Sequence, residues 1–235
     1  MITPPIKRYE CIECKDCIHK APYFECLSAS ELDIINKDRY SVRYREGEMI
    51  LKQGTSATHV LSLVGGIIKI YIEGIGDRNL LLDLLEPWSL IGGPGVHIDN
   101  KIHYSVAAMT DVTVCFIDAN HFRKIVEKNS TFASQMINHM SHKAVNMFEK
   151  LVSLTQKQMP GRMADGLLYL SKGFYRSDTF SMHLSRQDLA DLTAMSKDSA
   201  IRILKEFERD GVISINGREL RILDMRQLME ISQKG

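Results

Sequence analysis

The segment from residue 183 to 223 constrains this chain most, because it predicts a helix, a turn, a second helix and a hairpin in succession. Ser185, followed three residues later by Asp188, has the pattern of a capping box, in which two side chains satisfy the amides at a helix start. Ser196 is expected to cap the second helix, and Gly211 is expected to end it. This order of elements is typical of a winged helix-turn-helix domain.

The second helix of this segment is predicted to be amphipathic. Its apolar residues follow an i, i+3, i+4, i+7 spacing and are expected to be buried: Ala200, Ile203, Leu204 and Phe207. Its opposite face carries the charged residues Lys197, Asp198, Arg202, Lys205 and Arg209. Val212–Ile215 and Arg218–Leu223 are then predicted strands, and Asn216-Gly217 between them favours a hairpin with a type I′ turn.

A helix of this kind can enter the major groove of DNA with its first residues against the base edges. Arg202 lies about one turn inside the helix, where its guanidinium can donate to O6 and N7 of a guanine. Arg186 begins the preceding helix, where a phosphate is favoured. The predicted DNA-binding residues are Ser185, Arg186, Gln187, Ser196, Lys197, Asp198, Ser199 and Arg202. A solvated charged surface stays open as an alternative, because residues 160–235 hold 12 Lys or Arg and 11 Asp or Glu.

Length and composition exclude several classes of protein. The 235 residues are enough for two domains of ordinary size, and a net charge of +1 by itself favours no particular partner. No apolar run approaches the roughly 20 residues of a membrane helix, and Met1–Glu10 lacks the apolar core of a signal peptide. No phosphate loop, Gly-x-Ser-x-Gly or His-Glu-x-x-His motif occurs. We therefore expect a cytoplasmic protein that has no membrane partner and is not an enzyme.

Between residues 40 and 118, short β-favouring runs alternate with glycine turns. The predicted strands are 41–45, 49–52, 59–64, 67–72 and 112–117, and short strands at near-regular spacing favour a sandwich or a roll. Residues 1–27 are expected to be irregular. A short helix is expected to begin at Ser28 or Ser30, with Leu32, Ile34 and Ile35 as its apolar residues. Helical sequence resumes at Asn120.

The segment 130–158 has the most regular pattern in the chain. Its apolar residues follow the alternating four-three spacing of a heptad seam: Ala133, Ile137, Met140, Ala144, Met147, Leu151 and Leu154. On a helix they form one stripe for a partner helix, which predicts a homodimer. Phe132, Met136, Val145, Phe148 and Val152 are expected to face the chain's own domains, and a single wide core-facing surface stays the alternative. Pro160 marks the domain boundary, and a further helix is predicted over 161–173, ending at Gly173.

The chain as a whole resembles the Crp/Fnr family of bacterial regulators, most specifically in Leu184–Leu189 and Ser196–Leu204. The resemblance implies an α+β fold: a β-roll like a cyclic-nucleotide-binding domain (a double-stranded β-helix), a dimerisation helix and a winged helix-turn-helix. It also implies a two-fold dimer that binds an inverted-repeat operator in double-stranded DNA and contacts RNA polymerase. The expected domains are a cysteine-rich segment 1–27, a sensor 28–129, the dimer helix 130–159 and the DNA-binding domain 160–235. Asp198 replaces a family Glu, which leaves the half-site open.

Four of the five cysteines lie in one N-terminal segment, Cys11, Cys14, Cys17 and Cys26, and the fifth is Cys115. Clustered cytoplasmic thiols tend to bind metal or carry redox chemistry. The cysteines resemble those of the oxygen-sensing Fnr branch, which implies a [4Fe–4S] cluster on Cys14, Cys17, Cys26 and Cys115, with Cys11 as a substitute. The gap between Cys17 and Cys26 is longer than in that branch. Zinc with His19 as a further ligand, haem, or no metal at all, with Cys115 as a buried apolar residue, stay open.

Cyclic AMP is not an expected ligand. The cyclic-nucleotide members of the family hold the phosphate with an Arg-Ser pair after a Gly-Glu turn, whereas this chain has Gly92-Gly93-Pro94. Between Ile91 and Cys115 there is no Arg and no Glu, so the guanidinium that would pair with the phosphate is missing. Lys101 and His103 stay candidates for another anion or ordinary loop residues. A small-molecule effector in the roll, with structural zinc or no metal on the cysteines, is the alternative function.

Overall fold

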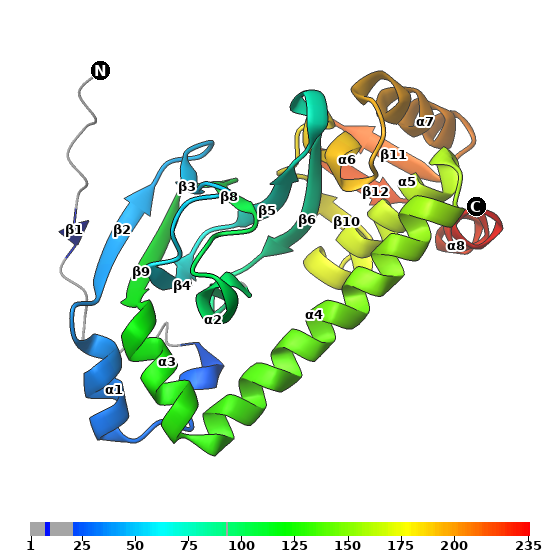
Figure 1. Ribbon diagram of the computed structural model, residues 1–235. Helices are drawn as coiled ribbons and strands as arrows, with labels where there is room; N and C mark the ends of the chain where they lie inside the picture. The colour runs from blue at the N-terminus through cyan, green and yellow to red at the C-terminus, as the bar shows by residue number, and fades with distance from the viewer. Residues whose placement is uncertain (1–7, 10–20, 93) are drawn as a thin grey trace. The chain divides into compact units, whose positions relative to one another are not determined.

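The computed structural model describes residues 8–9, 21–92 and 94–235. Two compact units make up the chain: residues 1–73 with 83–142, and residues 74–82 with 143–235 (Figure 1). The predicted ligands Cys11, Cys14 and Cys17, and His19, lie outside the described residues. In the described part of the chain, no helix is long and apolar enough to cross a membrane.

The first helix forms where the sequence predicted it. After a 3₁₀ turn at Pro22–Phe24 (η1), helix α1 spans Ala29–Asn36. Ser28 caps it: the Ser28 hydroxyl accepts from the Glu31 amide at 3.4 Å, and the Ser28 amide donates to the Glu31 carboxylate at 2.8 Å. Of the predicted apolar residues, Leu32 and Ile35 are buried and Ile34 is half-buried. Their burial fixes α1 against the roll.

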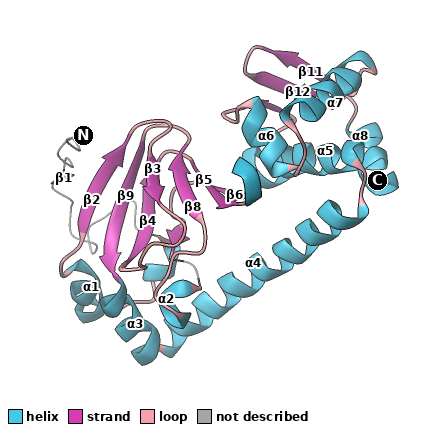
Figure 2. Cartoon of the chain, turned by 45° about the horizontal axis from the view of Figure 1, so that its top comes forward, coloured by secondary structure: helices cyan, strands magenta, loops and turns pink. Residues whose placement is uncertain are grey.

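The predicted β-roll is confirmed as two sheets (Figure 2). One has the order β1-β2-β9-β4-β7, with β1 Arg8–Tyr9, β2 Tyr40–Tyr44, β9 Val112–Asp118, β4 His59–Gly65 and β7 Leu90–Ile91. The other has the order β3-β8-β5-β6, with β3 Met49–Leu51, β8 Ser105–Ala108, β5 Ile68–Glu73 and β6 Asn79–Leu85. The sequence pattern missed β6, β7 and β8, and it also missed β1, which lies in the segment 1–27 that was expected to be irregular and pairs with β2. Between β5 and β6 lies the turn η2, Ile75–Asp77, and α2, Gly95–Ile98, follows β7.

Strand β9 is buried on both faces and joins the two cores of this unit. Val114 and Phe116 pack inside the roll. Ile117 points the other way, as alternation along a strand requires, and packs with Phe24 and Phe132 in a second core built on helices. Cys115 shares the face of Ile117 by the same alternation. Helix α3, Ala119–Lys128, follows β9 directly and is capped by the Asp118 carboxylate.

Helix α4 spans Ser130–Gln156, and α5 spans Met159–Leu168. Pro160 lies in the first turn of α5, where the missing amide of proline costs nothing. Helix α5 continues into a π-helical segment (η3), Tyr169–Tyr175. The predicted end at Gly173 is therefore wrong, because the chain leaves the helix at Arg176, which has the left-handed φ of +52°.

The C-terminal region is a winged helix-turn-helix, as predicted. Its elements are β10 Thr179–Ser181, α6 Arg186–Leu192, α7 Lys197–Arg209, β11 Ile213–Asn216, β12 Glu219–Ile222 and α8 Met225–Lys234. The order β10-β12-β11 adds a third strand that the sequence pattern missed. The predicted apolar stripe of α7 is confirmed as buried: Ala200, Ile203, Leu204 and Phe207. Gly211, with φ of +72°, ends the helix region as predicted.

The hairpin turn differs from the prediction. Asn216 pairs with Glu219, so the two loop residues are Gly217 and Arg218. Gly217 has φ of +61°, whereas Arg218 does not have a positive φ. A type I′ turn needs positive φ at both loop residues, and a type II′ turn needs it only at the first. The predicted type I′ turn is therefore wrong, because the strands pair one residue further along than the Asn-Gly signal suggested.

Replacing Gly66 with Ala should destabilise the roll more than replacing Gly47 with Ala. Both residues have φ of +85°, so both variants carry the cost of a left-handed L-residue, about 1–2 kcal/mol. Only at Gly66 would the new methyl collide with backbone, at the Asp111 carbonyl oxygen, whereas nothing lies within 4 Å of a methyl at Gly47. We expect a further loss of about 1–3 kcal/mol in urea unfolding followed by the fluorescence of Trp88. Equal losses of unfolding free energy in Gly66→Ala and Gly47→Ala would contradict the close approach of Gly66 to the Asp111 backbone.

Candidate nucleic-acid interface

The start of α6 is held by the predicted capping box. The Ser185 hydroxyl accepts from the Asp188 amide at 3.1 Å and donates to the Asp188 carboxylate at 2.6 Å, and the Ser185 amide donates to the same carboxylate at 2.9 Å. Gln187 is exposed, and its side-chain amide donates to Asp191 at 2.8 Å. The cap therefore orients the first turn of α6, and the Ser185 hydroxyl is engaged within it.

Helix α5 positions the turn between α6 and α7. Ala194 in this turn has φ of +49°, a conformation that L-residues adopt at a cost. The Arg162 guanidinium donates to the Ala194 carbonyl oxygen at 2.9 Å. Gly166 allows close approach, because a Cβ there would lie 2.9 Å from Thr193 Cγ2. These contacts fix the angle at which α7 leaves the turn.

The start of α7 brings several predicted DNA-binding residues together. Ser196 caps the helix, accepting from the Ser199 amide at 3.1 Å, and its hydroxyl donates to the Ser199 hydroxyl at 2.9 Å. Lys197 and Asp198 are exposed in the first turn. The Asp198 carboxylate therefore lies in solvent beside Lys197, at the N-terminus of the helix, where the helix dipole is positive.

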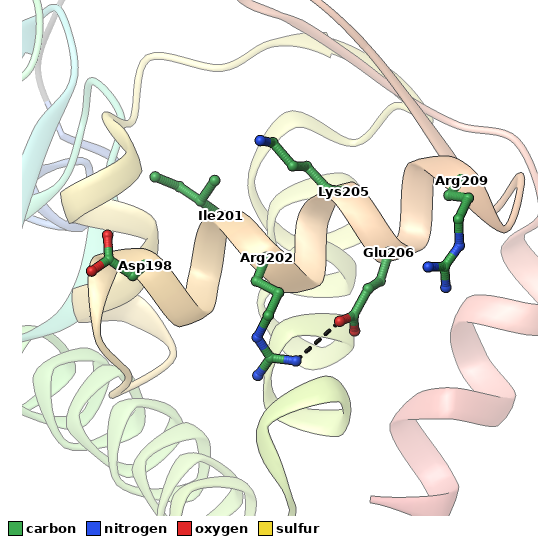
Figure 3. Close-up of a pocket in the computed structure, with 6 residues that line it drawn as sticks. All are labelled: Asp198, Ile201, Arg202, Lys205, Glu206 and Arg209. Atoms are coloured by element: carbon green, nitrogen blue, oxygen red, sulfur yellow. Dashed lines mark hydrogen bonds and ion pairs between the residues drawn. The ribbon is translucent and has the colours of Figure 1, made fainter.

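One face of α7 is hollowed into a shallow groove (Figure 3). The groove is lined by Asp198, Ile201, Arg202, Lys205, Glu206 and Arg209. These positions follow helical spacing and lie opposite the buried stripe. The predicted outer face is thus confirmed as a continuous surface. Of its lining residues only Asp198 and Arg202 were predicted to bind DNA; Lys205 and Arg209 were predicted for the outer face alone, and Ile201 and Glu206 for neither.

Arg202 and Glu206 form an ion pair that the sequence analysis missed. Arg202 Nη1 lies 3.0 Å from Glu206 Oε1, with side-chain exposures of 58% and 36%. The i, i+4 spacing of opposite charges was the available signal. An exposed pair of this kind contributes about 0.3–0.5 kcal/mol, so it can orient the guanidinium without competing seriously with a base edge.

Arg186 does not extend freely into solvent. Its side chain is half-buried, and its Nη1 is enclosed with no hydrogen-bond acceptor among the described residues. A buried donor without an acceptor costs about 1–3 kcal/mol. The residue predicted to hold a phosphate thus keeps one donor unsatisfied.

Helix α4 leaves a row of large apolar side chains uncovered: Ile137, Met140, Val145, Phe148, Leu151 and Val152. Within the predicted seam, Ile137, Met140, Ala144 and Leu151 are exposed, whereas Ala133, Met147 and Leu154 are half-buried. Among the residues expected to face the chain's own domains, Phe132 is buried and Met136 is half-buried. That expectation is wrong for Val145, Phe148 and Val152, which are exposed.

The exposed stripe departs from the predicted seam for a geometric reason. A straight α-helix drifts by about 20° per heptad relative to a strict seven-residue repeat. By the third heptad, Met147 and Leu154 have moved to the edge of the stripe, and Phe148 has moved to its centre. The side chains of Ile137 and Phe148, which are 65% and 63% exposed, lie along the centre of the exposed stripe.

Two of the predicted cysteine ligands lie in the described part of the chain. Cys115 is buried, with its sulfur 3.1 Å from the Ser41 hydroxyl and 3.4 Å from an Arg39 guanidinium nitrogen. Cys26 is half-exposed and packs beside the helical core, with its sulfur 3.6 Å from Gln135 Oε1 on α4. Among the described residues, no three His, Cys, Asp or Glu side chains are grouped as a metal site.

The loop candidates for an anion in the roll gather around a carboxylate instead. His103 Nε2 lies 3.1 Å from Asp99 Oδ1, and the Lys101 amide donates to the same oxygen at 3.0 Å. The negative charge of Asp99 opposes an anion at this position. Lys101 and His103 are therefore better explained as loop residues.

Two family models match the chain. A cyclic nucleotide-binding domain matches residues 41–129, and a Crp-like helix-turn-helix domain matches residues 161–231. Together they cover more than half of the chain. The roll and the winged helix-turn-helix described above coincide with these two ranges.

Similar proteins of known role span nearly the whole chain. The transcriptional activator protein FnrL of Cereibacter sphaeroides is 25% identical over 228 residues, which cover 92% of this chain and 90% of that protein. The transcriptional activator protein Anr of Pseudomonas aeruginosa is 24% identical over 226 residues, covering 93% and 92%. A CRP-like cAMP-activated global transcriptional regulator of Mycobacterium tuberculosis is 20% identical, covering 89% and 95%.

Solved structures share the fold. FixK2 from Bradyrhizobium japonicum matches with a TM-score of 0.73 at 17% identity, over 81% of this chain and 96% of that chain. A Crp/Fnr family regulator from Eubacterium rectale matches with a TM-score of 0.74 at 16% identity, over 90% and 98%. With a roll of the cyclic nucleotide-binding type followed by a Crp-like helix-turn-helix, this chain belongs to the Crp/Fnr family of transcription regulators, which are not enzymes.

Proposed function

We propose that this chain is a homodimer that binds an inverted-repeat operator through α7 and contacts RNA polymerase there, under the control of an effector held by its N-terminal cysteines. The observation that carries the proposal is the groove of α7, where Arg202 is exposed and loosely paired. A guanidinium in this position suits a guanine in the major groove.

The remaining residues of the interface support a division of labour. On binding, the Arg202 guanidinium leaves the Glu206 carboxylate and donates to guanine O6 and N7. Breaking the ion pair costs little free energy because the pair is exposed. To donate to a phosphate oxygen, the enclosed Arg186 guanidinium turns outward, and Nη1 then gains the acceptor that it lacks in the free chain. In the groove, the cations Arg202, Lys205 and Arg209 outnumber the two carboxylates. The exposed Lys197 adds a further positive charge, so the face attracts duplex DNA as a whole.

The uncovered stripe of α4 supports the homodimer. Apolar side chains in such a row are stabilised by leaving water, at about 25 cal/mol per Å². In a two-fold dimer the stripe of one protomer covers the same stripe of its partner. The pairing of two such helices would present two copies of α7, which is why an inverted repeat is the expected operator.

Cys14, Cys17, Cys26 and Cys115 are the proposed ligands of a [4Fe–4S] cluster, with Cys11 as the substitute. One described contact supports this ligand set: the Arg39 guanidinium lies 3.4 Å from the Cys115 sulfur, and hydrogen bonds to ligating sulfurs tune iron–sulfur clusters. The Cys26 sulfur contacts Gln135 of α4. Binding or loss of a cluster at Cys26 would therefore alter a contact of the dimer helix. When bound, the cluster would supply sensitivity to oxygen. Structural zinc on the same thiolates is the competing occupant.

Replacing Arg202 with Ala should weaken operator binding by about 1–3 kcal/mol and relax the preference at one position in each half-site. The reason is the loss of two hydrogen bonds to one base. Binding to duplexes selected from random sequence measures both effects. Arg226→Ala is the matched control, because Arg226 is an exposed arginine on α8, paired with Glu230 at i, i+4 as Arg202 is with Glu206. An unchanged consensus for Arg202→Ala would show that α7 does not read this base.

Replacing Phe148 with Glu should dissociate the dimer, whereas Asn146→Glu on the same helix should not. Each dimer loses two buried aromatic side chains and gains two facing charges, a cost of roughly 3 kcal/mol or more. Sedimentation velocity of both variants measures the effect. A Phe148→Glu protein that sediments as wild type would rule out this stripe as the interface.

Anaerobic reconstitution with iron and sulfide should give wild-type protein visible absorption and about four irons per chain. Cys115→Ser should lose both signals, because oxygen is a poor substitute for thiolate in such clusters, while Cys11→Ser should keep them. Absorption and iron analysis before and after exposure to air are the measurements. Colourless wild type, or wild type that retains tight zinc, would contradict the cluster and leave the DNA-binding proposal standing.

A further inference from the structure

Ile201 is an apolar side chain in a groove that is otherwise charged. It lies one turn after Asp198, next to Arg202 and one turn before Lys205 (Figure 3). Ile201 is half-buried, whereas the apolar stripe that holds α7 in its domain is fully buried without it: Ala200, Ile203, Leu204 and Phe207. The core of the domain therefore does not explain an isoleucine at this position.

The chemistry of the major groove does explain it. Base edges there present hydrogen-bond donors and acceptors, together with one apolar group, the C5 methyl of thymine. A β-branched side chain on a helix has one strongly preferred rotamer, so Ile201 presents its methyl groups with little loss of conformational freedom. An apolar side chain beside a guanine-reading arginine thus matches a thymine in the same half-site.

We propose that Ile201 is a specificity-determining residue that contacts the C5 methyl of one thymine in each half-site. This inference rests on the proposed operator binding through α7. Ile201 cannot donate or accept a hydrogen bond, so it favours the base that presents a methyl and disfavours a base that presents a polar group there. Cytosine at that position would present an amino group to an apolar side chain, which costs binding because the amino group loses water without gaining a partner.

The test uses the methyl as its probe. Operators are first selected from random duplex DNA with the full-length protein, purified and kept without air, and each thymine of the selected half-site is then replaced by deoxyuridine in turn. Burial of one methyl predicts that a single replacement weakens wild-type binding about fourfold, and replacement in both half-sites about fifteenfold.

The variants assign that effect to a residue. Ile201→Ala should bind thymine and deoxyuridine operators equally at the sensitive position, because no side chain reaches the methyl. Lys205→Ala, one turn away, should weaken all duplexes but keep the same sensitivity to deoxyuridine. Equal binding of Ile201→Ala to random DNA at low salt, compared with wild type, shows that the domain is folded.

Two failures are distinguishable. If no sequence is enriched in the selection, operator binding through α7 is wrong and the role of Ile201 falls with it. If a motif is enriched but no thymine is sensitive to loss of its methyl, or Ile201→Ala keeps the wild-type sensitivity, the motif stands and the role of Ile201 is wrong. A sensitive thymine that becomes indifferent only in Ile201→Ala supports the inference.

Discussion

The uncovered apolar stripe of α4 is the constraint on which the rest of the molecule depends. A single chain leaves Ile137, Phe148 and Leu151 half or more exposed, and a contiguous apolar row of this kind marks an interaction site. The N-terminal half of the same helix is tied to the chain by Phe132, which is fully buried, and by Tyr23, whose hydroxyl lies 2.8 Å from His139 Nδ1. The helix thus combines a fixed inner face with an outer face that is uncovered in the single chain.

Helix α5 links the C-terminal end of α4 to the helix-turn-helix within the second unit. Asp165 accepts hydrogen bonds from Ser153 in the last turn of α4, from Lys157 directly after that helix, and from Ser232 on α8. One turn earlier on α5, Arg162 holds the turn that precedes α7. Because both sets of contacts come from one short helix, α7 and the last turn of α4 keep a defined geometry within this unit.

Local chemistry was readable from the sequence, whereas features that depend on distant partners were not. The caps at Ser185 and Ser196 and the stop at Gly211 depend on neighbouring residues, and all three were predicted. Strands such as β8 were missed because they are defined by pairing with remote strands, and the hairpin register shifted for the same reason. Phe148 was assigned to the wrong face because a strict seven-residue repeat does not account for the rotation of a straight α-helix relative to that repeat. Ile201 was overlooked because a lone apolar residue has no signal until its charged neighbours are placed around it.

The central claim is that a symmetric dimer presents two copies of α7 to one operator. Hydroxyl-radical footprinting of the full-length protein, on an operator selected from random DNA, tests it most directly. The account predicts two equivalent protected patches on one face of the duplex, with centres about 34 Å apart, one helical turn. A single protected patch, or protection that does not depend on the sequence, would contradict it.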